Sequence, residues 1–171
     1  ALEERTEARV PMDWAATEDS LGSALATLGD MNDDTGKLDD AIAAFTAALT
    51  ERTRDRAPED WARTEANLGL AEKQLGARQD GTAGFDKAIV AYRAALTVFT
   101  RDAAPLDWAQ TEADIGIAAL ARADRSKSRG DLKLARDAYA AAYEVYAKMG
   151  DDYARYFKGK LADIDKRLKA G

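Results

Sequence analysis

The residues of this chain whose types and spacing could support chemistry are mostly acidic. Asp30, Asn32 and Asp34 have the spacing of the first three oxygen ligands in a calcium-binding loop. The segment departs from that pattern because Gly36 comes one position late and Ala41 stands where a bidentate glutamate is required. We interpret the segment as a soluble turn with helix-capping aspartates, and we expect no metal site.

The composition excludes several kinds of catalytic and structural site. The 171 residues include 31 Asp and Glu and 25 Lys and Arg, but no His and no Cys. Ser-His-Asp and Cys-His catalytic groups, zinc sites built from Cys and His, and disulfides are therefore impossible. Acid pairs such as Glu51 and Asp55 lie at helical spacing, which is typical of surface charge. We expect a protein that is not an enzyme and that uses no cofactor.

The charge is uneven along the chain. Residues 1–60 carry 15 acids and 6 bases, a net charge of −9, whereas residues 151–171 carry 4 acids and 6 bases, a net charge of +2. The overall net charge of −6 disfavours non-specific binding to nucleic acid or to an anionic membrane. No apolar run is long enough to span a bilayer, and charged residues interrupt the start of the chain, where a signal peptide would be apolar. We expect no membrane or nucleic-acid partner, and we favour the cytoplasm while the compartment stays open.

These residues are positioned by an internal repeat of 47 residues. The sequence Pro-x-Asp-Trp-Ala begins at Pro11 and recurs at Pro58 and Pro105. A Thr-Glu pair and then a Leu-Gly or Ile-Gly pair follow at the same offset in all three copies. Each copy holds two amphipathic stripes of helical period, separated by a Gly- and Asp-rich segment. The sequence therefore predicts an all-α chain of helix pairs, in which each proline begins a first helix.

The phase of the repeat sets the expected organisation, a single repeat domain over residues 1–171. Residues 1–10 align with the end of a second helix, so they are predicted to be the second helix of a partial repeat. The next units are repeat 1 (11–57), repeat 2 (58–104), repeat 3 (105–150) and a C-terminal capping helix (151–171). One helix in the partial repeat, two in each full repeat and one cap give about eight helices.

Small residues recur inside the predicted helices and indicate close packing. A glycine follows the leucine or isoleucine of each first helix, although glycine costs about 1 kcal/mol there relative to alanine. Its presence in three copies predicts a neighbouring helix that passes too close for a Cβ atom. An aromatic residue of each second helix is expected to fill the space beside it. The residues concerned are Gly22, Gly69, Gly116, Phe45, Tyr92 and Tyr139.

The order of these residues resembles the tetratricopeptide repeat family. In the second copy, Leu68-Gly69 is followed by Gly76, Phe85, Ala88-Ile89, Tyr92, Ala95-Leu96 and Pro105, in the order of that family's signature. The unit is longer than the family's usual length of about 34 residues, and it resembles the longer units of large bacterial repeat proteins. HEAT repeats share a period of about 40–47 residues but do not normally show this order. The resemblance implies a right-handed superhelical solenoid of antiparallel helix pairs.

The resemblance also implies a concave groove, lined by the first helices, that binds a peptide or helix of a partner protein. Outward positions vary between copies while packing positions do not, which is the pattern of a binding face and also of an unconstrained solvated face. The implied groove residues are Asp19, Ser23, Thr27, Arg63, Asn67, Leu70, Lys73, Gln74, Gln110, Asp114 and Ile117. Only Asn67 matches the Lys, Asn and Arg set with which some family members clamp a C-terminal carboxylate. A basic or mixed polar and apolar peptide suits the acidic first third better.

A structural role is the alternative. The acidic N-terminal end, with Leu2, and the basic face of the last helix, from Lys158 to Lys169, are complementary in charge. Head-to-tail contacts between such ends would form a homo-oligomer through the ends of the solenoid and could continue into filaments. The sequence therefore predicts a non-catalytic protein-interaction scaffold, with a self-associating module as the second reading.

Overall fold

The computed structural model describes residue 6 and residues 10–170, and every element in that part of the chain is a helix. The seven helices are α1 (Pro11–Asn32), α2 (Thr35–Glu51), α3 (Pro58–Arg78), α4 (Ala83–Ala95), α5 (Pro105–Ser126), α6 (Arg129–Tyr146) and α7 (Asp151–Ala170). The expected all-α class is confirmed. The further helix expected over residues 1–10 lies outside the described residues, apart from Thr6 and Val10, and neither of these two is helical.

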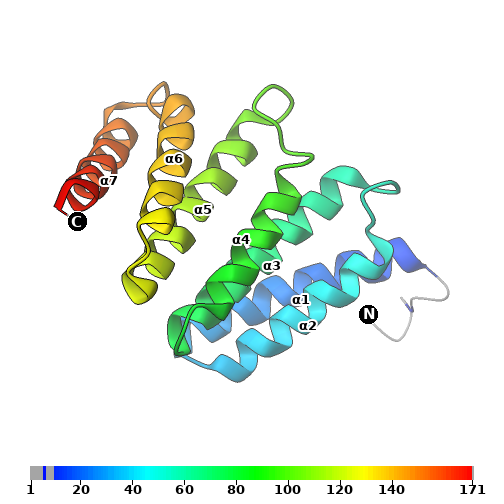
Figure 1. The fold of residues 1–171 in the computed structure, drawn as a ribbon. Helices are drawn as coiled ribbons and strands as arrows, with labels where there is room; N and C mark the ends of the chain where they lie inside the picture. The colour runs from blue at the N-terminus through cyan, green and yellow to red at the C-terminus, as the bar shows by residue number, and fades with distance from the viewer. Residues whose placement is uncertain (1–5, 7–9, 171) are drawn as a thin grey trace.

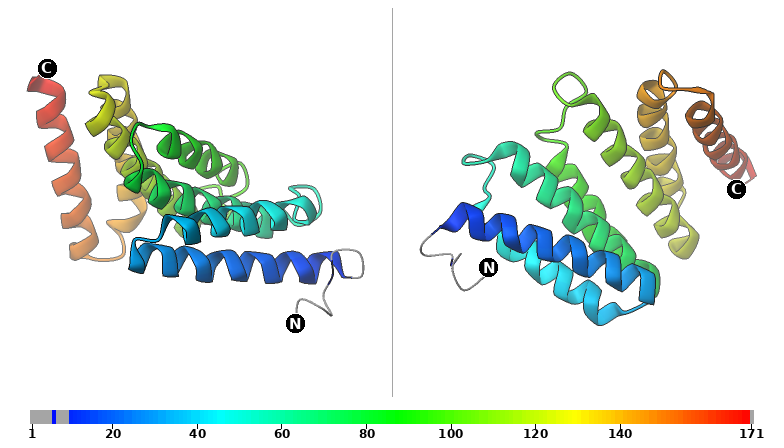
Figure 2. Two further views of the ribbon diagram at one scale, coloured as in Figure 1. Left: turned by 90° about the horizontal axis from the view of Figure 1, so that it is seen from below. Right: turned by 180° about the vertical axis from the view of Figure 1, so that it is seen from behind.

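The helices pack side by side in chain order (Figure 1). The most extensive contacts join α1 with α2, α3 with α4 and α5 with α6, and each pair then packs on the next helix along the chain. α3 also contacts α1 and α5. α1 and α7 lie at opposite ends of the row, and the helix axes turn along it, so that α7 stands across the direction of α1 (Figure 2).

The first helix of each pair begins with the same local structure. Pro11, Pro58 and Pro105 occupy the first turn, and the residues before them share φ values of −144°, −150° and −142° and ψ values of 68°, 69° and 67°. Proline is favoured there because its φ suits a helix and its missing N–H would have no helical partner. Each first turn also carries an acidic residue near the positive end of the helix dipole. The prediction that each proline begins a helix is confirmed.

The segment that resembles a calcium loop contains a helix cap. Asp34 precedes α2, and its carboxylate accepts a hydrogen bond of 3.1 Å from the backbone N–H of Lys37. Asp30 and Asp33 pair with Arg78 of α3 at 3.1 and 2.8 Å. These contacts agree with the interpretation of a capped turn. Within the described part of the chain, no group of three or more acidic side chains is arranged to hold a metal ion.

Each pair of helices crosses where a glycine faces an aromatic ring. The facing residues are Gly22 and Phe45, Gly69 and Tyr92, and Gly116 and Tyr139. A Cβ atom built on these glycines would lie 2.8, 2.8 and 3.1 Å from the nearest ring carbon, and all three rings are buried. The prediction of a close helix approach at the repeated glycines is therefore confirmed, and the ring occupies the space that a Cβ atom would need.

Candidate binding surface

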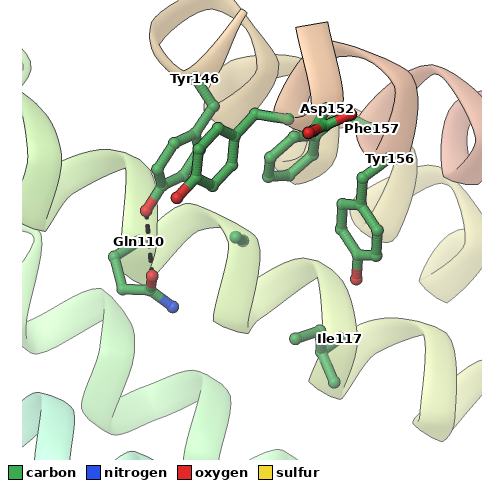
Figure 3. Close-up of a pocket in the computed structure, with 8 residues that line it drawn as sticks. Gln110, Ile117, Tyr146, Asp152, Tyr156 and Phe157 are labelled. Atoms are coloured by element: carbon green, nitrogen blue, oxygen red, sulfur yellow. Dashed lines mark hydrogen bonds between the residues drawn. The ribbon is translucent and has the colours of Figure 1, made fainter. Parts of the chain in front are cut away.

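A hollow of about 460 Å³ opens between α5, the end of α6 and α7 (Figure 3). Its lining residues are Gln110, Ala113 and Ile117 of α5, Tyr146 of α6, and Asp152, Tyr153, Tyr156 and Phe157 of α7. Its volume lies in the range of about 300–1,000 Å³ that is typical of ligand pockets. We call it the aromatic hollow, because four of its eight lining residues are aromatic.

The four rings form one wall of the aromatic hollow. The Tyr146 ring stacks on those of Tyr153 and Phe157, with centroid distances of 5.5 and 5.3 Å and interplanar angles of 15° and 11°. Tyr156 meets Phe157 edge to face at 5.2 Å. Phe157 is buried, whereas Tyr153 and Tyr156 are each 50% exposed. The wall therefore combines a buried inner ring with two half-exposed outer rings, of which Tyr156 is partly covered by Lys160.

A chain of polar contacts runs from α3 to the end of α6 beside this wall. Lys73 Nζ donates to Asp114 Oδ1 at 2.7 Å, and Gln110 Nε2 donates to Asp114 Oδ2 at 2.9 Å. Tyr146 Oη donates to Gln110 Oε1 at 3.0 Å (Figure 3). Each side chain is held by the next, so these polar groups are already oriented before a ligand arrives. Three of them, Lys73, Gln110 and Asp114, are residues that the family resemblance implied for the groove.

Carboxylates act on the tyrosine side chains at this surface and disfavour the charged phenolate form. Burial raises the pKa of Tyr146 above its ordinary value, and the charges of Asp114 and Asp107 raise it further. Burial also raises the pKa values of Tyr92 and Tyr139, with a smaller contribution from Asp114 in both. A potential that disfavours a phenolate favours a cation in the same place.

A second hollow, of about 390 Å³, adjoins the aromatic hollow at Ile117, which lines both. Its other lining residues are Lys73 and Ala77 of α3, Phe85 of α4, and Ala121, Asp124 and Arg125 of α5. Lys73 belongs to the polar chain described above, so the two hollows also share that set of contacts. We call the two adjoining hollows the α3–α7 groove.

Arg125 lines the second hollow. Its guanidinium carbon lies 4.7 Å from the centroid of the Phe85 ring, and its nitrogens donate to four backbone carbonyls around the end of α3 at 2.6–2.9 Å. A cation is favourable there because the carbonyls at a helix C-terminus are partly negative. Arg78, 47 residues earlier, donates in the same way to the carbonyl of Asp30 at the end of α1. The sequence analysis missed these two arginines, although their spacing is that of the repeat.

Asp19, one of the predicted groove residues, is buried in an ion pair. Its carboxylate lies 3.1 Å from Arg52 Nη1, and it accepts a weak hydrogen bond of 3.4 Å from Asn67. Arg52 also donates to Thr64 Oγ1 at 2.8 Å. The side chains of Arg52 and Asp19 are only 7% and 13% exposed. Asp19 and Asn67 therefore join α1 to α3 and to the end of α2, and neither lines the α3–α7 groove.

The five remaining predicted residues are Ser23, Thr27, Arg63, Leu70 and Gln74, and none of them lines either hollow. The hydroxyls of Ser23 and Thr27 donate to backbone carbonyls one turn earlier in α1. Arg63 pairs with an aspartate in the first turn of its own helix. Leu70 is exposed and Gln74 is half-buried. The groove thus gathers Lys73, Gln110 and Ile117, with Asp114 behind them.

The sequence analysis also missed the aromatic wall. By the 47-residue spacing, Tyr146 is equivalent to Phe99 and to Arg52. Each of the three lies near a residue of the first helix of its pair: Arg52 pairs with Asp19, Phe99 belongs to a cluster that Ala66 joins, and Tyr146 lines the aromatic hollow with Ala113. The sequence contains a signal for the aromatic wall. The first repeat has the charged pair Asp19 and Arg52, and the equivalent positions of the later repeats hold an alanine and an aromatic residue.

Comparisons of the chain with protein-family models, with curated proteins and with solved structures find no match. Among the described helices, none is both long enough and apolar enough to cross a membrane. The fold and the surface define the class of protein: the described part of the chain is all-helical, its helices pack in adjacent pairs, and the two adjoining hollows lie across α3, α5 and α7.

Proposed function

We propose that the chain is a non-catalytic interaction module of tetratricopeptide-like repeats, arranged as a right-handed superhelix. In this proposal the α3–α7 groove binds a peptide or a helix of a partner protein. The observation that carries the proposal is the junction at Ile117, where the aromatic hollow and the second hollow adjoin. Side chains spaced along one face of a peptide or helix would enter both hollows, as in helix-in-groove recognition.

The chemistry of the groove supports a peptide ligand. Tyr153, Tyr156 and Ile117 are partly exposed and offer apolar area in the centre of the surface. Gln110 and Asp114 supply polar groups that hydrogen bonds already hold in place. Aromatic anchors beside a few fixed polar groups are typical of protein interfaces. Fixed side chains also lose little conformational entropy when a ligand binds.

Selection of peptides from a random display library on the immobilised chain tests this proposal. Ile117→Asp places a charge at the junction of the hollows and is expected to weaken the selected peptides by at least about tenfold. Leu106→Asp is the matched control, because Leu106 is an exposed aliphatic residue of the same helix and lies outside the groove. Peptides that bind both variants equally, or a selection that yields none, would refute the groove assignment.

Self-association is a second candidate function, and the outer face of α1 favours it. Ala24 is exposed, whereas Ala71, its equivalent on α3, is fully buried in a cluster with Phe45 of α2. Leu28 is 48% exposed, whereas its equivalent Leu75 is 4% exposed. A helix of a second copy that packed on α1 would cover this stripe as α2 covers α3. The basic face of α7, at the other end of the row, complements the acidic first third in charge.

Sedimentation equilibrium over a range of protein and salt concentrations tests the second candidate. Leu28→Glu is expected to abolish association by placing a charge within the α1 stripe. Val90→Glu is the matched control, because Val90 is an exposed aliphatic residue on α4, 69% exposed against 48% for Leu28, and lies outside the α1 stripe. A chain that is monomeric at every concentration and salt would exclude self-association and would leave the peptide groove unaffected.

A further inference from the structure

We infer that the aromatic hollow receives the cationic side chain of a lysine or arginine from the bound peptide. The inference rests on the proposed function, because it names the chemistry of the partner at the α7 end of the α3–α7 groove. Three observations carry it: among the described residues no cation covers two of the rings, carboxylates lie beside these rings, and the lining combines apolar residues with a carboxylate.

Cations of the same chain cover several aromatic rings of this protein. Arg101 lies over Trp108 at 5.6 Å, Arg125 over Phe85 at 4.7 Å, Lys158 over Tyr143 at 5.9 Å and Lys160 over Tyr156 at 5.7 Å from the ring centroid. Among the described residues, no cation lies in this way over Tyr146 or Tyr153. Tyr153 is half-exposed in the hollow, so part of its ring is available to a cation from outside. The ring quadrupole attracts such a cation.

Carboxylates lie beside the Tyr146 and Tyr153 part of the wall, whereas Lys160 lies over the Tyr156 ring at its other end. Asp152 is the one charged residue of the lining, and Asp107 and Asp114 act on the Tyr146 ring from nearby. Lys73 compensates Asp114 at 2.7 Å. Arg155 lies 3.5 Å from Asp152, but both side chains are highly exposed, and exposed pairs of this kind contribute little. A cation of the ligand can therefore replace Arg155 at Asp152, but this carboxylate is 94% exposed and contributes as little to that cation as it does to Arg155 unless the ligand excludes water from it.

The lining combines apolar residues with a carboxylate, which matches the apolar stem and charged end of a long basic side chain. Among the lining residues, Ala113 and Ile117 of α5 offer apolar contact to a methylene stem, Tyr153 offers a ring to the charged tip, and Asp152 offers a carboxylate. Lysine and arginine combine an apolar stem with a charged end in this way. An acidic side chain would be repelled by the same carboxylates, and an uncharged aliphatic one would gain only the contacts of the stem.

An NMR titration with three short peptides tests the inference. The peptides are acetylated and amidated alanine pentapeptides whose central residue is lysine, norleucine or glutamate. Norleucine matches the lysine stem without the charge. The lysine peptide is expected to shift the ring signals of Tyr146 and Tyr153 in a saturable way, and at least about fivefold more tightly than the norleucine peptide. The glutamate peptide is expected to cause no saturable shift, and added salt is expected to reduce the preference for lysine.

Two variants of Tyr153 separate the contribution of the aromatic ring to lysine binding from the contribution of apolar bulk. Tyr153→Phe keeps the ring and is expected to keep the preference for lysine, whereas Tyr153→Leu keeps the apolar bulk and is expected to lose it. Tyr143→Leu is the control, because that ring lies outside the hollow and Lys158 already covers it. Equal binding of the lysine and norleucine peptides, or a preference that survives Tyr153→Leu, would overturn the inference.

The display selection and this titration can fail independently. Selected peptides that depend on Ile117 but tolerate replacement of every lysine by norleucine and every arginine by citrulline would leave the proposed function standing and would overturn the inference. A selection that yields no peptide dependent on Ile117 refutes the proposed function, and the inference about a cation in a bound peptide is overturned with it.

Discussion

The buried ion pair of Asp19 and Arg52 can be exchanged for the residues that the chain itself uses 47 positions later. Ala66 and Phe99 stand at the equivalent positions and belong to an apolar cluster around the end of α4. The double variant Asp19→Ala/Arg52→Phe therefore transfers the second arrangement to the first helix pair. We expect this double variant to be as stable as the parent or more stable, and we expect each single variant to be strongly destabilised.

The magnitude follows from the burial of the pair. Both side chains are almost fully removed from water, and Arg52 Nε is buried without a hydrogen-bond partner in the described structure. Removal of one member leaves an uncompensated charge and costs about 3–5 kcal/mol, whereas replacement of the whole pair by apolar residues is neutral or stabilising by about 1–4 kcal/mol. A loss of about 3 kcal/mol corresponds to a decrease in Tm of roughly 6–12 °C for a chain of this size. The coupling energy of the double-mutant cycle is then at least about 6 kcal/mol in magnitude, because two losses of about 3 kcal/mol or more disappear in the double variant.

Urea and thermal unfolding followed by far-ultraviolet circular dichroism measure these free energies. Glu144→Ala is the control, because it breaks the exposed pair of Arg101 and Glu144, and its cost is expected to stay within about 1 kcal/mol. A double variant as unstable as the sum of the two single variants would refute the equivalence of the two arrangements. A cost below about 1 kcal/mol for Asp19→Ala would refute the buried charge pair itself.

Three further predictions concern the helix packing, the acid groups and the repeated arginines. Gly69→Ala is expected to destabilise the fold by about 1–3 kcal/mol, despite the better helix propensity of alanine, because the added Cβ meets a buried ring. Gly159→Ala is expected to stabilise it by up to about 1 kcal/mol, because no described atom lies within 4 Å of the added Cβ. Urea unfolding of both variants measures these changes. Burial raises the pKa of Glu65 above its ordinary 4.5, so the stability of the fold decreases as pH rises from about 4.5 to the raised value and stays lower above it. Glu65→Gln should therefore be more stable than the parent at neutral pH and equal to it below about pH 4 in thermal unfolding, and a pH-independent difference would contradict this. Arg125→Gln removes the cation at the end of α3 and is expected to cost about 1–3 kcal/mol and to increase amide exchange at that end of α3 more than elsewhere, as hydrogen exchange can show.

The sequence predicts the helical frame well because the signals of that frame are local. A proline begins each first helix, and the period of the apolar residues marks each amphipathic face. The repeated glycines are also informative, because a residue that weakens a helix recurs only where something compensates. The ring over each glycine, such as Tyr92 over Gly69, is that compensation.

The candidate site was predicted in part, and the misses have physical causes. The family resemblance placed Lys73, Gln110 and Ile117 on an outward face of the first helices, and the structure finds them in the lining of the two adjoining hollows. The burial of Asp19 depends on Arg52, which follows α2 and reaches across to α1, and helical periodicity carries no information on such a contact. The aromatic wall depends on how α7 meets the end of α6, where the repeat phase has already decayed.

The aromatic hollow arises because the repeat fixes some positions and leaves others free. A Cβ atom at Gly116 would lie 3.1 Å from the buried Tyr139 ring and would force it to shift, and the equivalent Gly22 and Gly69 face rings in the same way. The position of Tyr146 only has to fill space at the end of a second helix, and a charged residue or another aromatic residue fills it in the other two pairs. The helix that follows then determines the result: α7 brings Tyr153 and Phe157, whose rings stack on Tyr146. A binding surface can therefore change at this position while the packing of the helices stays the same, because the ring at position 146 and the glycine at position 116 serve separate contacts.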